Sequence, residues 1–197
     1  MILKICGITN QEDADAAVEF GATAIGFNFY PKSPRYVTRE QARGIVTTGV
    51  LRVGVFVHAL REDIEAAIGD ADIEVAQLHG DTDSEYPLIR CWKALQVEPG
   101  FELTQEDDGR TDALVLDGPA GHLYGGSGKT FDWGLVAGLK RRIIIAGGLD
   151  GSNVARAVGI ARPWGVDACS RIESAPGKKD HQKMKEFLRA ARMALQS

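Results

Sequence analysis

The stretch Ile2-Leu3-Lys4-Ile5-Cys6-Gly7-Ile8-Thr9 decides between the two architectures open to this chain. It begins as a short apolar run, which is typical of a strand covered on both faces of a parallel sheet. An open, doubly wound sheet normally carries a glycine-rich fingerprint in the turn after its first strand. The turn here is Gly7-Ile8-Thr9, which lacks that fingerprint, and this favours a closed barrel.

Apolar strand-like runs alternate with helical segments along the whole chain. Eight such runs imply right-handed crossovers and one parallel sheet. We therefore expect an α/β fold, a (β/α)₈ TIM barrel with a closed parallel sheet, as one domain over residues 1–197, although about 250 residues are usual. The expected strands are Ile2–Cys6, Ala24–Phe27, Arg52–Val57, Glu74–Leu78, Cys91–Ala94, Ala113–Asp117, Arg142–Ala146 and Gly165–Ala168.

The helical segments carry start and stop signals of their own. Thr9 and Glu12 have the spacing of a capping box, and Gly21 is placed to end the helix that follows. The segment 98–112 is polar and contains Pro99 and Gly100, so only a short helix is expected there. The other expected helices are Thr38–Thr47, Ala59–Ile68, Leu149–Ile160 and Lys179–Leu195.

Composition excludes several classes of protein. Hydrophobic residues make up 44% of the chain, and a net charge of -4 gives no basic surface for nucleic acid or an anionic membrane. No run approaches the roughly 20 apolar residues of a membrane helix, and the N-terminus does not resemble a signal peptide. Three widely spaced cysteines do not form a disulfide framework. We expect a soluble, cytoplasmic protein, and the four histidines show no metal-ligand spacing.

Side-chain parity on the first strand predicts a buried ion pair. Lys4 and Cys6 are two residues apart and share a face; if Ile5 points to the helices, both point into the barrel. A buried ammonium needs a counter-charge, and the eighth strand offers Asp167 beside it in a closed barrel. Cys6 is then either a small apolar side chain of the core or a thiolate that acts as base or nucleophile near a positive charge.

The sixth strand ends in a carboxylate. Asp117 follows Leu114, Val115 and Leu116, and parity places it on the same face as Val115. If that face points inward, Asp117 stands at the mouth of the barrel opposite Cys6, although a simple loop cap is the alternative. Burial there would raise its pKa and suit it to donate a proton.

The ends of the last two strands have the features of a phosphate site. Gly147 and Gly148 follow the seventh strand, and Ser170 and Arg171 follow the eighth. Backbone N–H groups in such turns and at helix N-termini bind phosphate, and barrels often place this site after strands seven and eight.

A glycine-rich stretch and two of the cysteines resemble functional motifs but have simpler explanations. The stretch 125–130, Gly-Gly-Ser-Gly-Lys-Thr, resembles a P-loop, but Leu123 stands where that motif needs its first glycine, so we expect a loop that can cover the site. Cys91 and Cys169 lack the setting of Cys6, and Cys91 opens a strand, so we expect both to fill the core.

Seven blocks of sequence, in order, resemble the phosphoribosylanthranilate isomerase family over nearly the whole chain. Any one of them could occur by chance, but seven beside the expected strands are specific. The blocks, given by residue range, are 4–9 (KICGIT), 29–36 (FYPKSPRY), 53–57 (VGVFV), 77–80 (QLHG), 125–133 (GGSGKTFDW), 146–149 (AGGL) and 176–180 (PGKKD).

The resemblance implies an Amadori rearrangement of N-(5-phosphoribosyl)anthranilate, a small sugar phosphate, with no cofactor and no metal. In the family's pattern Cys6 matches the general base and Asp117 the general acid. Arg35 matches the position that meets the anthranilate carboxylate. His79 would line the pocket, and Asp167 would support it together with Lys4.

One position departs from the family. After the eighth strand the family usually has Ser-Gly followed by Val-Glu, whereas this chain has Ser170, Arg171, Ile172 and Glu173. Either Arg171 has an ordinary backbone conformation and its side chain adds a charge near the phosphate, or the phosphate site is altered. We expect the former.

Two alternatives remain at this point. A related sugar-phosphate barrel, such as the histidine-pathway isomerase, works with two aspartates, the first at the end of strand one, where this chain has Cys6. A barrel that binds a phosphate ligand without catalysis would fit the substitution at Arg171 but not the retained acid and base. A barrel of this size can be a monomer, and no exposed apolar stripe demands a partner.

Overall fold

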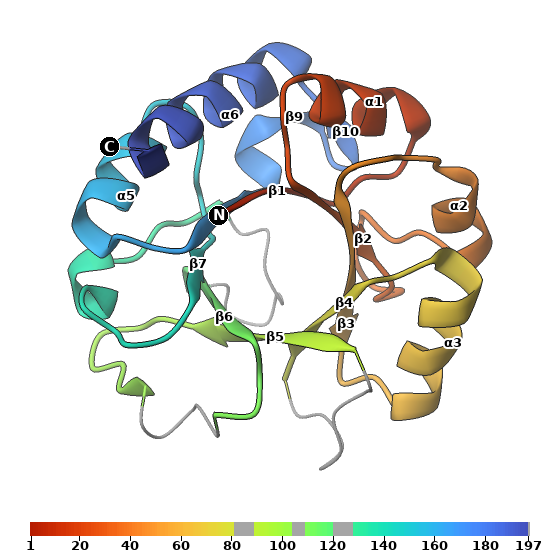
Figure 1. Ribbon diagram of the computed structural model, residues 1–197, viewed down its shortest axis with the longest axis horizontal. Coiled ribbons are helices and arrows are strands. Elements are labelled where there is room, and N and C mark those ends of the chain that lie inside the picture. The colour runs from red at the N-terminus through yellow and green to blue at the C-terminus, as the bar shows by residue number, and fades with distance from the viewer. Residues whose placement is uncertain (81–88, 104–108, 120–127, 197) are drawn as a thin grey trace.

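The computed structural model describes residues 1–80, 89–103, 109–119 and 128–196. Within them eight parallel strands form a closed barrel in the order β1 to β8, and β8 pairs with β1 to complete the ring (Figure 1). The predicted barrel is thereby confirmed. The strands are β1 (Ile2–Cys6), β2 (Ala24–Asn28), β3 (Leu51–Val57), β4 (Val75–His79), β5 (Arg90–Gln96), β6 (Ala113–Asp117), β7 (Ile143–Ile145) and β8 (Gly165–Ala168).

Strands β1, β6 and β8 begin and end where the sequence predicted, and the other five differ at their ends. The largest difference is in β5, which continues to Gln96 because its ladder with β6 extends until Gln96 lies opposite Asp117. Strand β4 runs one residue further than expected, to His79, where it pairs with Val57 of β3. These extensions bring Gln96 and His79 to the same end of the barrel as Asp117.

The core has two layers that follow the alternation of side chains along each strand. On β6, Leu114 and Leu116 belong to the layer between the sheet and the helices. Ala113 and Val115 belong to the smaller cluster inside the barrel, which also contains Trp92. Because Asp117 is two residues beyond Val115, it faces the same interior, as parity predicted.

Helices cover the outside of the barrel (Figure 1). Helices α1, α2 and α3 lie outside the first four strands, α5 and α6 pack on each other beyond β7, β8 and β1, and a hairpin of β9 and β10 precedes α6. The bounds are α1 (Gln11–Glu19), α2 (Arg39–Gly44), α3 (Arg61–Ala71), η1 (Trp133–Val136), α5 (Val154–Ala161), η2 (Ser170–Ile172), β9 (Glu173–Ala175), β10 (Lys178–Lys179) and α6 (His181–Gln196).

The predicted capping box at Thr9 is wrong. Asn10 caps α1 through its side chain, which accepts a hydrogen bond from the backbone N–H of Asp13, while the Thr9 hydroxyl donates to the carbonyl of Gly177. The stop at Gly21 is confirmed, since the helix ends at Glu19 and Gly21 follows with φ of 89°.

Two further expectations concern helices. Residues 104–108 lie outside the described part of the chain, so the short helix expected in 98–112 stays a prediction. Among the described residues, no helix has both the length and the apolar character needed to span a bilayer.

Candidate active site

A cavity of about 360 Å³ opens at the C-terminal ends of the strands, where barrel enzymes hold their active sites. The ends of β1, β2, β4, β6, β7 and β8 all contribute to it, as does the loop after β2. Of the predicted site residues, all except the fully buried Lys4 line this cavity: Cys6, Arg35, His79, Asp117, Gly147, Gly148, Asp167, Ser170 and Arg171.

Lys4 lies beneath the cavity and forms the predicted ion pair. Its ammonium is fully buried and donates to Asp167 Oδ2 at 2.7 Å, and the two residues are partners in the ladder between β1 and β8. Burial alone would lower the pKa of Lys4, but the negative charges of Asp167 and Cys6 outweigh burial and raise the pKa. A permanent positive charge therefore lies under the floor of the cavity.

Cys6 lies directly above this charge, with its side chain in the cavity. A hydrogen bond from the Cys169 thiol is the largest cause that lowers the pKa of Cys6 well below its usual range, and Lys4 and Lys179 add to it against the effect of burial. The thiolate is the reactive form of cysteine. Of its two interpretations, the charged environment favours a reactive thiol over a core side chain.

The expectation that Cys169 fills the core is wrong. It follows β8 immediately and lines the cavity, where its thiol lies beside Cys6 and 4.0 Å from Lys179 Nζ. The sequence did not reveal the positive charge near Cys169 because Lys179 lies on β10 and is not a sequence neighbour of Cys169. Cys91, by contrast, is 3% exposed in the outer core layer, as expected.

Asp117 faces the cavity from the opposite part of the barrel wall. It is 8% exposed, and burial raises its pKa to about 6, with Cys6 contributing and the Gly118 N–H opposing. Its Oδ1 atom has no hydrogen-bond partner among the described residues. Gly147 has φ of 79°, and a side chain there would come within 2.5 Å of this oxygen, so the glycine keeps the space around the carboxylate open.

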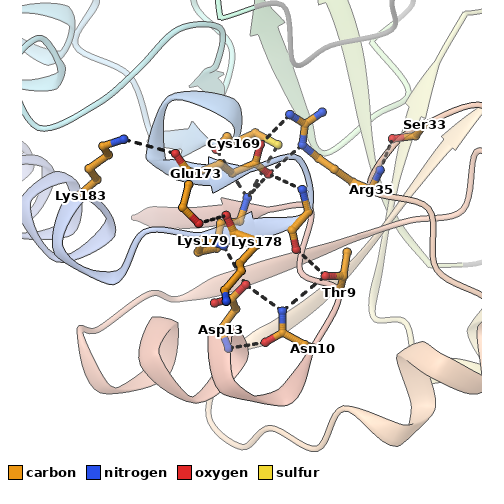
Figure 2. A network of polar contacts seen from close by, with 12 residues as sticks. Thr9, Asn10, Asp13, Ser33, Arg35, Cys169, Glu173, Lys178, Lys179 and Lys183 are labelled. Atoms are coloured by element: carbon orange, nitrogen blue, oxygen red, sulfur yellow. Dashed lines mark hydrogen bonds and ion pairs between the residues drawn. The ribbon is translucent and has the colours of Figure 1, made fainter.

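Glu173 holds two cations at the rim of the cavity (Figure 2). It accepts both Nε and Nη2 of Arg35, at 2.8 and 2.7 Å, and Nζ of the fully buried Lys179 at 2.9 Å. Such a two-pronged pair fixes the plane of the guanidinium. Arg35 reaches the cavity as predicted, in an orientation that Glu173 determines. Gly7, which has φ of 73°, leaves room for the Arg35 side chain to cross above β1.

His79 lines the cavity as predicted, and its neighbour Gln77 was missed. Burial and the nearby Lys4 lower the pKa of His79 to about 4, so the ring is neutral near pH 7. Its Nε2 lies 2.9 Å from Gln77 Nε2. Gln77 is two residues before His79 on β4 and is 3% exposed, so strand parity was a signal that could have found it.

The turns after β7 and β8 meet at one end of the cavity. Gly147 and Gly148 both have positive φ, and a side chain at Gly148 would approach the backbone of Gly128 within 2.6 Å. Ser170 begins the short helix η2. Arg171 has no positive φ, which confirms the expected ordinary backbone conformation. Its side chain forms an ion pair with Asp150, 2.5 Å from Nη2 to Oδ2.

The loop 125–130 is only partly described, because residues 125–127 lie outside the described part of the chain. Its expected role as a cover over the site therefore stays a prediction. The described residues Gly128 and Lys129 run beside Gly147 and Gly148.

Comparison with known proteins agrees with this geometry. A family model described as "PRAI: N-(5'phosphoribosyl)anthranilate (PRA) isomerase" matches residues 3–190. The N-(5'-phosphoribosyl)anthranilate isomerase of Solibacter usitatus is 61% identical over 197 residues, which cover 99% of each chain.

Solved structures give the same result. The phosphoribosyl anthranilate isomerase of Thermotoga maritima has 38% sequence identity and a TM-score of 0.87, covering 98% of this chain and 100% of its own. A second isomerase structure, in complex with reduced 1-(o-carboxyphenylamino)-1-deoxyribulose 5-phosphate, has 36% identity and a TM-score of 0.82 with the same coverage. The chain therefore belongs to the phosphoribosylanthranilate isomerase family of tryptophan-biosynthesis enzymes.

Proposed function

We propose that this chain converts N-(5'-phosphoribosyl)anthranilate into 1-(o-carboxyphenylamino)-1-deoxyribulose 5-phosphate, with Asp117 as general acid and Cys6 as general base. One observation carries the assignment: a single cavity contains a carboxyl group whose pKa is raised to about 6 and a thiol whose pKa is lowered. An acid and a base with pKa values shifted toward neutrality are what this isomerisation needs.

Asp117 acts first in the proposed mechanism. Its protonated carboxyl group donates a proton to the furanose ring oxygen, the bond from that oxygen to C1 breaks, and C1 becomes the carbon of a Schiff base. The buried position of Asp117 supports this role because burial disfavours the charged form. The space beside Oδ1, kept open by Gly147, is where the ring oxygen would approach.

Cys6 acts second. The Schiff base draws electrons from C2 and acidifies its hydrogen, and the Cys6 thiolate removes that proton to leave an enolamine. The enolamine then tautomerises to the aminoketose as the hydroxyl of C2 loses its proton and C1 gains one. Lys4 and the thiol of Cys169 support the ionised state of Cys6. Lys4 and Asp167 stay paired and position the charge rather than transfer protons.

The two ends of the substrate would bind at the two ends of the cavity. Arg35 would receive the anthranilate carboxylate through Nη1, the nitrogen that the two hydrogen bonds to Glu173 leave out. The neutral ring of His79 would line the wall between. At the other end, we assign the phosphate to the two turns that contain Gly147, Gly148, Ser170 and Arg171.

Residues 1–197 act as one domain, which the packing of α6 against β1 and β8 supports by tying the end of the chain to its start. A monomeric state and a cytoplasmic location stay predictions from the sequence.

The test is a fluorescence assay that follows the disappearance of freshly prepared phosphoribosylanthranilate. We expect turnover by the wild type and a loss of roughly 10²–10⁴-fold in kcat for Cys6→Ala and for Asp117→Asn, since each removes one acid or base. Binding of the reduced product analogue should persist in both variants. The matched control is Cys91→Ala, which removes a thiol 3% exposed in the outer core layer.

Two outcomes would contradict the proposal. If the folded wild type binds the analogue but does not turn over the substrate, the barrel is a binding protein. If either variant keeps more than about a tenth of wild-type kcat, the acid and base are assigned to the wrong residues.

A further inference from the structure

Cys6 is the last residue of β1, and Cys169 directly follows the neighbouring strand β8. Strands β1 and β8 pair in parallel, with Lys4 opposite Asp167 and Ile5 opposite Ala168, so Cys6 and Cys169 come next in this register. Adjacent strands lie about 4.8 Å apart. A disulfide requires Cα atoms about 4.4–6.8 Å apart, so this spacing is compatible with one. Parity places both side chains on the face of Lys4 and Asp167.

The two thiols also approach each other within the cavity. Both residues line the same open space, and their thiols lie close enough to shift each other's pKa in opposite directions. A side chain at Gly7 would come within 3.2 Å of Cys169 Sγ, so this glycine leaves room for that sulfur. A small reagent that enters the cavity therefore meets two adjacent sulfur atoms.

The surroundings favour reaction with an oxidant. Lys4 lies beneath Cys6, Lys179 Nζ is 4.0 Å from Cys169 Sγ, and the guanidinium of Arg35 adds a third positive charge near both. Positive charges and access to solvent are the features that distinguish redox-active cysteines from inert buried ones. Cys91 differs from Cys6, because burial and Asp112 raise the pKa of Cys91 to about 11.

We propose that Cys6 and Cys169 form a peroxide-sensitive dithiol, whose oxidation to a disulfide reversibly switches off the isomerase. The Cys6 thiolate attacks hydrogen peroxide, the O–O bond breaks, and the sulfur becomes a sulfenic acid while a proton converts the leaving hydroxide to water. The Cys169 thiol then attacks that sulfur and releases a second water as the S–S bond forms. Peroxide accepts the two electrons, and a dithiol reductant returns them.

The loss of activity rests on the proposed function, since a sulfur held in a disulfide cannot accept the proton from C2. Cys169 has a protective role as well. By resolving the sulfenic acid, it prevents further oxidation of Cys6 to the sulfinic acid, which thiols do not reduce.

The test treats the purified full chain with a small excess of hydrogen peroxide and reads two signals. Non-reducing peptide mapping by mass spectrometry should find one linked pair, containing Cys6 and Cys169, with Cys91 still a thiol. The fluorescence assay should show a loss of at least about 100-fold in turnover for the oxidised fraction, the contribution of a general base. Dithiothreitol should restore both signals.

Two variants serve as controls. Cys91→Ala should behave as the wild type. Cys169→Ser, compared with its own starting activity and checked for folding by circular dichroism, should form dimedone-reactive sulfenic acid at Cys6 and lose activity that dithiothreitol does not recover at higher peroxide.

The failures of the two proposals are distinguishable. Absence of the linked peptide, or direct formation of sulfinic acid at Cys6 in the wild type, overturns the dithiol. A linked peptide with undiminished turnover overturns the switch and also the assignment of Cys6 as base. An enzyme that is inactive before any treatment refutes the proposed function alone, because the peptide map still reads the disulfide.

Discussion

Replacing Asp117 with asparagine should stabilise the protein near neutral pH and do so much less at acidic pH. The carboxyl group is 8% exposed, and burial, the largest cause, raises its pKa from 3.8 to about 6. The folded state therefore holds this proton more tightly than the unfolded state does. Asparagine has nearly the same shape and no charge, so it removes the penalty of ionising a buried carboxyl group.

The sign and size of the effect follow from proton linkage. Because the folded pKa is the higher one, the free energy of unfolding falls as pH rises from 3.8 to about 6, and the full penalty applies above that window. A difference of about 2 pKa units corresponds to about 3 kcal/mol, at about 1.36 kcal/mol per unit. Between about pH 4.5 and pH 7.5, roughly 2 kcal/mol of this penalty develops.

The assay is urea unfolding of the wild type and of Asp117→Asn at those two pH values. The stability difference between the two proteins should change by about 2 kcal/mol in favour of asparagine at the higher pH. Comparing the two pH values cancels contributions that do not depend on pH, such as the hydrogen bonds of the new amide. The measurement thus isolates the ionisation of one carboxyl group.

A control carboxylate whose pKa is lowered strengthens the test. Burial would raise the pKa of Asp150, but hydrogen bonds from Ser152 and the ion pair with Arg171 outweigh burial and lower it. Its ionised form therefore supports folding above its unfolded pKa, and this support is lost only at lower pH. Asp150→Asn should thus show nearly the same stability loss at both pH values. A stability difference for Asp117→Asn that is the same at both pH values would refute the reasoning.

Three further changes test the surroundings of the site. Lys4→Met leaves a buried carboxylate without its cation and should reduce the free energy of unfolding by roughly 3–5 kcal/mol in urea; a loss below about 1 kcal/mol would contradict the ion pair. Gly147→Ala places a side chain at φ of 79° and should cost more than about 1 kcal/mol, whereas Gly159→Ala, at an open helical position, should gain about 0.5–1 kcal/mol. Cys169→Ala should raise the pKa of Cys6, followed by thiolate absorbance at 240 nm, and an unchanged titration would exclude their hydrogen bond.

Local alternation along a strand predicted one part of the site without help from the family resemblance. Parity alone placed Lys4 beside Asp167 and turned Asp117 toward the interior, because a closed parallel barrel leaves only two faces for each strand. The same rule applied to β8 would have placed Cys169 on the face of Asp167, two residues earlier. The prediction that Cys169 fills the core was therefore wrong, although the alternation of side chains already placed it on the cavity face.

Other parts of the site depend on contacts between distant segments and have no local signal. Arg35 and Glu173 are separated by 138 residues, and Lys179 reaches them from the short strand β10. Glu173 and Lys179 are brought together because they pair across the β9–β10 hairpin (Figure 2). The predicted cap at Thr9 was wrong for a different reason. Thr9 and Asn10 are both good capping residues, and tertiary contacts decide which of them caps the helix.

The arrangement of charge explains how one cavity can hold an acid and a base in opposite protonation states. Cys6 lies above the buried ammonium of Lys4 and beside a thiol donor, and these contacts favour its anion. Asp117 lies across the cavity, where burial dominates and the nearest anion is Cys6 itself. Each ionised Cys6 therefore raises the pKa of Asp117, which favours the pairing of base and acid that the proposed mechanism requires. The same charges that prepare Cys6 for proton transfer also expose it to oxidation, and Cys169 is positioned to limit the damage.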